Sequence, residues 1–140
     1  MWILTRATSE QCRYPMARSI ASRGVTGDAA QLAAVDRVNQ AIKVMCDQLG
    51  MDYVLGLKLP AVMQRKGANG LIVENDAPLS AGGSAIPAIM KMSAVQLRGK
   101  YLATGVVTVQ DLDEYCRFAD DSRTGAVYYA TVAVSSRKSG

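Results

Sequence analysis

The full sequence of 140 residues contains no histidine, and this absence limits the chemistry that the chain can perform. Ser-His-Asp and Cys-His mechanisms both need an imidazole to take the proton of the nucleophile. Three cysteines, Cys12, Cys46 and Cys116, lack the spacing of a zinc site, and no histidine is present to complete one. We therefore expect reduced thiols and no bound metal.

A second group of side chains could line or orient a small organic substrate. The candidates are Asp52, Tyr53, Met90 and Tyr101, together with Glu74 and Asp76. Positioning of a substrate can by itself lower a reaction barrier by several kcal/mol. Each polar candidate also has a simpler, structural explanation: a helix cap for Asp52, half-buried packing for the tyrosines, and solvated charge at a strand end for the last two. These structural explanations are favoured, and no catalytic residue is assigned.

Charge and hydropathy exclude two classes of partner. The chain has 16 basic and 12 acidic residues, and the basic excess lies near its two ends. A nucleic-acid binder is expected to carry a basic stripe interleaved with aromatic residues, and this sequence contains no such stripe. No apolar run approaches the roughly 18 residues of a membrane span. The first 24 residues hold four arginines and one acid, a weak mitochondrial-targeting pattern, but we favour a cytoplasmic protein. In that interpretation Trp2–Leu4 forms a short strand followed by an irregular segment.

The candidate residues must be positioned by helices that the apolar spacing predicts. Asp28 can cap a long helix that ends at Gly50, and its apolar members recur every three or four residues. They are Leu32, Val35, Val38, Ile42, Met45 and Leu49. A short helix over Leu55–Lys66, a strand over Leu71–Glu74 and a flexible connection through Gly82 and Gly83 are expected to follow.

The second half of the chain predicts a helix pair and a strong strand. A helix is expected over residues 86–103, weakened by Gly99 and stopped at Gly105. Thr108 and Asp111 resemble a capping box that starts a second helix, which ends at Asp120. Residues 126–136, "AVYYATVAVSS", combine β-branched and aromatic residues and predict the strongest strand. The fold class is therefore α/β: a small, mostly antiparallel sheet of two or three strands packed with four helices.

Three quoted segments together resemble the back half of class I S-adenosylmethionine-dependent methyltransferases. In "GMDYVLGLKLPAVMQRKGANGLIVENDAPLSAGG" the matching residues are Gly50, Asp52, Leu55–Lys66, Gly67 and Leu71–Glu74, and "YLATGVVTVQDLDEYCRFADD" and "AVYYATVAVSSRK" continue the likeness. The resemblance covers about residues 28–138. It implies that the last strand lies antiparallel beside an edge strand, and that residues 86–120 form a helical lid over a substrate pocket. On this basis residues 1–27 are an N-terminal strand and irregular segment, and residues 28–140 the methyltransferase-like domain.

The chain departs from this family where the cofactor would bind. No glycine-rich turn joins a strand to a helix, and no acid follows it to hold the ribose. The resemblance therefore implies a truncated, substrate-side half that binds no S-adenosylmethionine alone and reaches this cofactor only through a partner. Methylation by the isolated chain is not expected.

Three functions stay open. In the first, the chain is a subunit in small-molecule metabolism that pairs with itself or with a methyltransferase-like chain and supplies a substrate-side wall or an oligomerisation surface. In the second, it is a non-methylating cyclase or isomerase that holds a small organic substrate, and in the third, a structural assembly protein. We favour the first and expect a dimer formed through an open strand edge and the long helix, including Val35 and Ile42.

Overall fold

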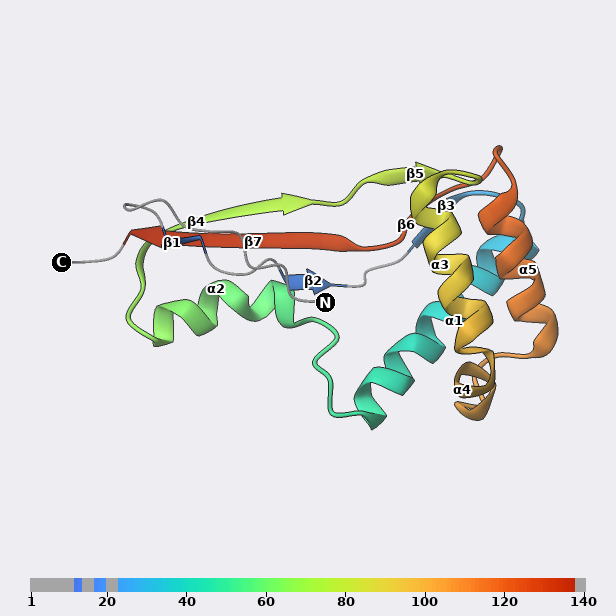
Figure 1. Ribbon diagram of the computed structural model, residues 1–140, viewed down its shortest axis with the longest axis horizontal. Helices are drawn as coiled ribbons and strands as arrows, with labels where there is room; N and C mark the ends of the chain where they lie inside the picture. Colours follow the sequence, from blue (N-terminus) through green and yellow to red (C-terminus); the bar gives the residue numbers. More distant parts are fainter. Residues whose placement is uncertain (1–11, 14–16, 20–22, 138–140) are drawn as a thin grey trace. The chain divides into compact units, whose positions relative to one another are not determined.

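The computed structural model describes residues 12–13, 17–19 and 23–137, and the side chains of residues 23–136 (Figure 1). The chain divides into two compact units. Among the described residues, the sheet unit comprises residues 12–13, 17–19, 54–77 and 129–137, and the helical unit comprises residues 23–53 and 78–128. These bounds differ from the expected division after residue 27, because strands near residues 12–19 pair with the last strand of the chain. The expected strand Trp2–Leu4 lies outside the described residues.

Helix α1, Ala29–Gln48, begins in the helical unit as the sequence predicts. The Oδ1 atom of Asp28 accepts the backbone N–H of Gln31 at 2.9 Å, and the Oε1 atom of Gln31 accepts the backbone N–H of Asp28 at 3.0 Å. This reciprocal capping box satisfies two N–H groups that a helix start leaves without partners. The chain leaves the helix at Gly50, whose φ of 69° lies in the left-handed region that glycine adopts readily.

The middle of the apolar stripe of α1 is buried inside the helical unit, whereas its last member, Leu49, is 63% exposed. Val35, Val38 and Ile42 are 0%, 0% and 4% exposed, because α1 packs against helices α4 and α5 and strand β3 of its own chain. The expectation that Val35 and Ile42 form an interface with a second chain was therefore wrong. The helix is covered by the two later helices, which the sequence could not place against it.

Three shorter helices complete the helical unit. They are α3 (Ala85–Gln96), α4 (Arg98–Ala103) and α5 (Val109–Asp120). The single helix expected over residues 86–103 is divided at Leu97, two residues before Gly99, which lowers helix propensity. Helix α5 begins with the expected capping box, since Thr108 accepts the N–H of Asp111 at 3.1 Å and Asp111 accepts the N–H of Thr108 at 2.9 Å.

A small antiparallel sheet closes the helical unit. Its strands are β3 (Arg23–Thr26), β5 (Leu79–Ala81) and β6 (Gly125–Val127), in the order β3-β6-β5. The connection after residue 77 was expected to be flexible, but it contains β5 and contacts the end of α5. The N–H of Gly83 donates to the carbonyl of Ala119 at 2.8 Å, and the N–H of Gly82 donates to the carbonyl of Thr124 at 3.1 Å.

The sheet unit is built around β7, Ala130–Arg137. On one side β7 pairs with β1 (Cys12–Arg13) and β2 (Ala17–Ser19), and on the other with β4 (Asn69–Asp76), all antiparallel. Helix α2, Leu55–Arg65, packs on this sheet (Figure 1). Its Met63 contributes to a core with Val132 and Val134, flanked by Leu59, Ala68 and Leu71.

The structure confirms an α/β fold with small antiparallel sheets. It also differs from the expected architecture, because the strands form two sheets and the helices number five among the described residues. The strand expected over residues 126–136 is divided at Tyr128 and Tyr129, so β6 and β7 belong to different units. No helix in the described part of the chain has the length and apolar character of a membrane span.

Candidate functional site

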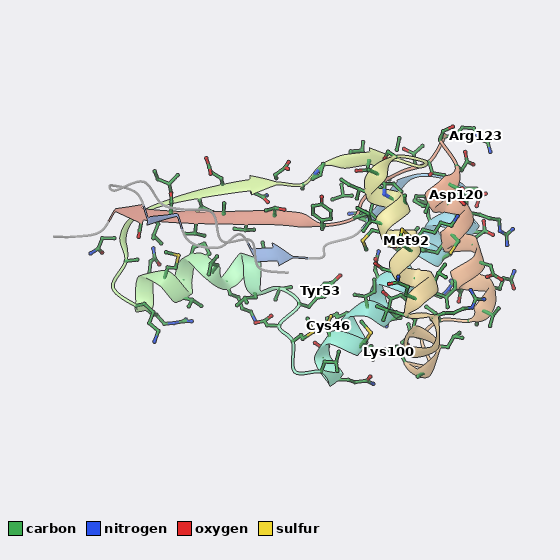
Figure 2. All side chains as sticks on the ribbon, in the orientation of Figure 1. Cys46, Tyr53, Met92, Lys100, Asp120 and Arg123 are labelled. Carbon is green, nitrogen blue, oxygen red and sulfur yellow. The ribbon has the colours of Figure 1, made fainter. Side chains whose placement is uncertain are left out.

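Four tyrosines gather in the helical unit, and we call Tyr53, Tyr101, Tyr115 and Tyr128 the tyrosine cluster. Tyr53 follows α1, Tyr101 lies on α4, Tyr115 lies on α5, and Tyr128 follows β6. Tyr115 interacts electrostatically with each of the other three. Cys46, on α1, interacts with Tyr53 and Tyr101, and Figure 2 shows where Cys46 and Tyr53 lie. The helical unit thus brings together aromatic hydroxyls from four separate segments.

Burial makes these hydroxyls weak acids. It raises the pKa of Tyr53 and of Tyr128 to about 12 each, and for Tyr53 the charge of a Cys46 thiolate adds to the effect. Burial also raises the pKa of Tyr101 and of Tyr115. Burial disfavours the charged phenolate, so every member of the tyrosine cluster is neutral at physiological pH. A neutral phenol can donate a hydrogen bond to an acceptor oxygen, but it is a poor general base.

The nearby thiols are also poorly activated. Burial raises the pKa of the Cys46 thiol, and the charge of Asp47 raises it further. Burial likewise raises the pKa of Cys116, although Lys91 and Arg98 act in the opposite direction. The thiolate is the reactive form of cysteine, so neither side chain has the properties of a nucleophile at neutral pH. The arrangement is suited to binding rather than to covalent catalysis.

Two members of the tyrosine cluster carry buried hydroxyls with no hydrogen-bond partner in the described part of the structure. These are the hydroxyls of Tyr115 and Tyr128, and both residues are 1% exposed. A buried polar atom without a partner costs about 1–3 kcal/mol, so such atoms usually meet water or a ligand. They are the most distinctive chemical feature of the helical unit.

The candidates from the sequence are distributed over both units. Tyr53 and Tyr101 lie in the tyrosine cluster, Tyr53 half-buried and Tyr101 3% exposed. Asp52 is exposed beside Tyr53, and Met90 is half-buried on α3. Glu74 and Asp76 are exposed on β4 of the sheet unit. Of these candidates, the structure therefore brings only Tyr53 and Tyr101 together in the tyrosine cluster.

Sequence reasoning missed three contributors to this site, Cys46, Tyr115 and Tyr128. In the sequence, Tyr115 falls within the helix expected from Thr108 to Asp120, and Tyr128 within the strand expected over residues 126–136. A signal was available, because a tyrosine at a core position must bury a hydroxyl together with its ring. That signal shows that the buried hydroxyl needs a hydrogen-bond partner, but it does not show which residues come together in the fold.

A second feature of the helical unit is the α3 face, which we define by Ile89, Met92 and Val95. These residues are 61%, 60% and 56% exposed, and their spacing of three places them on one side of the helix. The same side carries Ala85 and Ala88, which are also exposed. Met92 is labelled on α3 in Figure 2. Three large apolar side chains in one exposed row are typical of a surface that another molecule covers.

Basic residues flank the α3 face. Between Asp76 and Asp111 the chain contains Lys91, Arg98 and Lys100 and no acid. Lys91 pairs with Asp120, and Arg98 pairs with Asp113 at 2.9 Å, so both bases contact acids of α5. The exposed Lys100, labelled in Figure 2, forms no ion pair with the described residues. Of these three bases, only Lys100 on α4 therefore lacks an acid partner among the described residues.

Among the residues that the structure describes, no group of three or more Cys, Asp or Glu side chains could hold a metal ion. Comparison with known proteins leaves the family undetermined: no family model, curated protein or solved structure matches this chain.

Proposed function

We propose that this chain is a binding subunit that docks its α3 face on a methyltransferase-like partner and supplies part of the wall around that partner's substrate. The observation that carries the proposal is the exposure of Ile89, Met92 and Val95. Helix α3 is apolar except for Lys91, Ser93 and Gln96, and a helix of such composition is normally buried over most of its surface. Helix α3 contacts α4, α5 and β5 on its inner side, so its outer side is available to a second molecule.

Lys100, the base of this segment without an acid partner among the described residues, indicates which kind of partner surface would fit. An apolar groove with an acidic rim would cover Ile89, Met92 and Val95 and place negative charge near Lys100. Such complementary charge mainly raises the association rate and excludes wrong partners. The apolar contact would supply most of the affinity, because large side chains in the centre of an interface contribute most to binding.

The sheet unit supports a partner of the methyltransferase class. The resemblance implies an edge strand, then lid helices, then a last strand antiparallel beside the edge strand. Strands β4 and β7 pair antiparallel from Ile72–Ser135 to Asp76–Thr131, and α3, α4 and α5 lie between them in the sequence. The chemistry of methyl transfer would come from the partner, since the neutral phenols and thiols of the helical unit offer no general base at neutral pH.

The test is co-purification with candidate methyltransferase chains, beginning with any that is found to be encoded next to this chain's gene. The unchanged chain should copurify with one of them, and Met92→Asp should abolish this by placing a charge in the apolar contact. Val109→Asp is the matched control, because Val109 is also exposed (53%) but lies on α5 outside the α3 face. Retention of the partner by Met92→Asp would overturn the proposal. So would micromolar binding of S-adenosylmethionine by the chain alone in calorimetry.

A small-ligand site in the tyrosine cluster is a second candidate function, favoured by the two buried hydroxyls of Tyr115 and Tyr128. These hydroxyls could donate to a carbonyl or carboxylate oxygen and hold a substrate for cyclisation or isomerisation. This candidate predicts that removal of either hydroxyl weakens the protein's stability in the presence of its ligand. The α3-face proposal predicts no such dependence.

A further inference from the structure

Among the described residues, strand β4 has one paired edge and one open edge. It pairs with β7 on one side, and no described residue pairs with it on the other. All eight residues from Asn69 to Asp76 are exposed except Leu71, which is half-buried. Ile72 and Val73 are 52% and 50% exposed and point to opposite faces of the sheet, because side chains alternate along a strand. An added strand would therefore cover apolar surface on both faces.

The open edge specifies the kind of occupant. A free strand edge presents a row of unpaired N–H and C=O groups, and another extended backbone satisfies them best. Proteins protect such edges with inward charges, proline or bulges. The register of β4 shifts between Asn69 and Ile72, so the irregular part is confined to the start of the strand. The strand nevertheless runs without a break from Asn69 to Asp76, so the backbone on both sides of Ile72 is available to pair.

The charge pattern of β4 favours a second copy of this chain. Exposed bases, Arg65 and Lys66, precede the strand, and exposed acids, Glu74 and Asp76, lie at its end. An antiparallel copy would bring the acidic end of each strand toward the basic end of the other. A parallel copy would place like charges side by side, which is destabilising.

We propose that β4 pairs antiparallel with β4 of a second copy, centred on Ile72. This register places Ile72 opposite Ile72 on one face of the sheet and Leu71 opposite Val73 on the other. Glu74 then lies opposite Gly70 rather than opposite another charge. A register centred on Val73 would place Ile72 opposite Glu74, so the Ile72-centred register gives the better cross-strand pairs.

This inference is independent of the α3-face proposal, because it uses a different unit of the chain and a different partner. Pairing of one short strand forms a small interface, so the dimer belongs to the weak class. Light scattering at about 0.1 mM chain should therefore show a dimer that dissociates on dilution. Ile72→Lys should weaken it by about tenfold or more, since an edge lysine opposes strand pairing. Met92→Asp should leave it unchanged.

Cross-linking tests the register even where a charged variant folds poorly. Directly opposite residues of antiparallel strands have Cα atoms about 4.5–5.5 Å apart, within the range that a disulfide spans. Ile72→Cys should therefore form a covalent dimer under mild oxidation. Glu74→Cys is the matched control, because the two copies of residue 74 would be four strand positions apart, roughly 13 Å.

The outcomes separate the two proposals. A monomer at about 0.1 mM without an Ile72→Cys cross-link, or equal cross-linking of both cysteine variants, would overturn β4 pairing. A dimer that resists Ile72→Lys but dissociates with Met92→Asp would overturn it as well, and would assign self-association to the α3 face.

Discussion

The two units of this protein bury their apolar residues in different ways. In the helical unit, α1 and α5 contribute a row of residues that are fully enclosed by other elements of the same unit, including Val35, Leu112 and Phe118 at 0–1% exposure. In the sheet unit the core consists of Met63, Val132 and Val134, while β4 leaves Ile72 and Val73 half exposed. The helical unit thus encloses a core between its helices, and its row of exposed apolar residues, the α3 face, lies on the outer side of a helix. In the sheet unit Ile72 and Val73 are exposed on a strand of the sheet itself, which is able to pair further.

Ion pairs between helices are a further feature of the helical unit. Acids of α5 pair with a base from each of three other helices: Asp111 with Arg37 of α1, Asp113 with Arg98 of α4, and Asp120 with Lys91 of α3. Exposed pairs contribute only about 0–1 kcal/mol each. Their arrangement nevertheless gives α5 a defined position, so the largest effects of substitution should be found in this helix.

The largest effect is expected when a charge enters the core of the helical unit. Leu112→Asp and Tyr115→Asp should each destabilise the protein by about 4 kcal/mol or more, because both positions are 1% exposed and a charge introduced there would be buried. Asp113→Asn and Arg117→Ala on the same helix should cost about 1 kcal/mol or less, since both side chains are mostly exposed. Denaturant midpoints measure the four variants. Equal shifts would mean that the buried face of α5 is assigned incorrectly.

A smaller loss is expected where a glycine permits close packing. A Cβ atom at Gly82 would lie 2.0 Å from the carbonyl oxygen of Asp121, so Gly82→Ala must displace backbone. We expect a loss of about 1–3 kcal/mol, the usual cost of overpacking. Gly99→Ala on α4 is the control, because no atom lies within 4 Å of the added carbon and alanine favours a helix. That variant should gain about 0.4–1 kcal/mol. Thermal melting of both variants checks the prediction, and a loss with Gly99→Ala would contradict it.

Removal of the buried hydroxyls should leave the stability of the protein unchanged or raise it modestly, in contrast to the losses expected above. If no partner satisfies the hydroxyls of Tyr115 and Tyr128, Tyr115→Phe and Tyr128→Phe should leave stability unchanged or raise it by up to about 1 kcal/mol. A loss of about 1–3 kcal/mol would instead mean that a bound water or ligand accepts these hydroxyls. Melting temperatures before and after extensive dialysis distinguish a released ligand from a retained water. This measurement decides whether the core of the helical unit is only structural.

The smallest effect concerns the ion pair between α1 and α5. The Nε atom of Arg37 donates to Oδ1 of Asp111 at 2.8 Å, and this bond, with the hydrogen bonds from Thr108, lowers the pKa of Asp111 below its ordinary 3.8. A carboxylate with a lowered pKa stabilises the fold above its ordinary pKa and loses that contribution as the pH falls through the lowered value. Because the Arg37 side chain is 44% exposed, Arg37→Ala should cost about 1 kcal/mol or less at neutral pH.

The pH dependence provides the control for this pair. The difference in stability between the unchanged chain and Arg37→Ala should shrink at acid pH, once Asp111 is protonated in the folded state. Carboxyl NMR should also show the pKa of Asp111 rising in Arg37→Ala. A constant difference across the acid range would show that Arg37 acts through packing of its hydrocarbon part rather than through charge.

The sequence alone determined the features that depend on neighbouring residues. The starts of α1 and α5 follow from the predicted cap at Asp28 and the predicted capping box at Thr108, where the partner residue lies three positions further along the chain. The stripe of α1 follows from helical spacing, and the strand over Leu71–Glu74 from its β-branched residues. Such local signals need no knowledge of the rest of the fold, so they also predicted the α/β class.

Only the tertiary structure decided which distant segments meet. It divided residues 126–136 between two sheets, placed the stripe of α1 in an internal core, and joined Tyr53 and Tyr101 to Tyr115 and Tyr128. The stripe on α1 predicts burial equally well against a second chain or against α5, because apolar burial has no direction. The choice is made by contacts between residues more than 70 positions apart, such as Arg37 with Asp111, and no local pattern encodes that pairing.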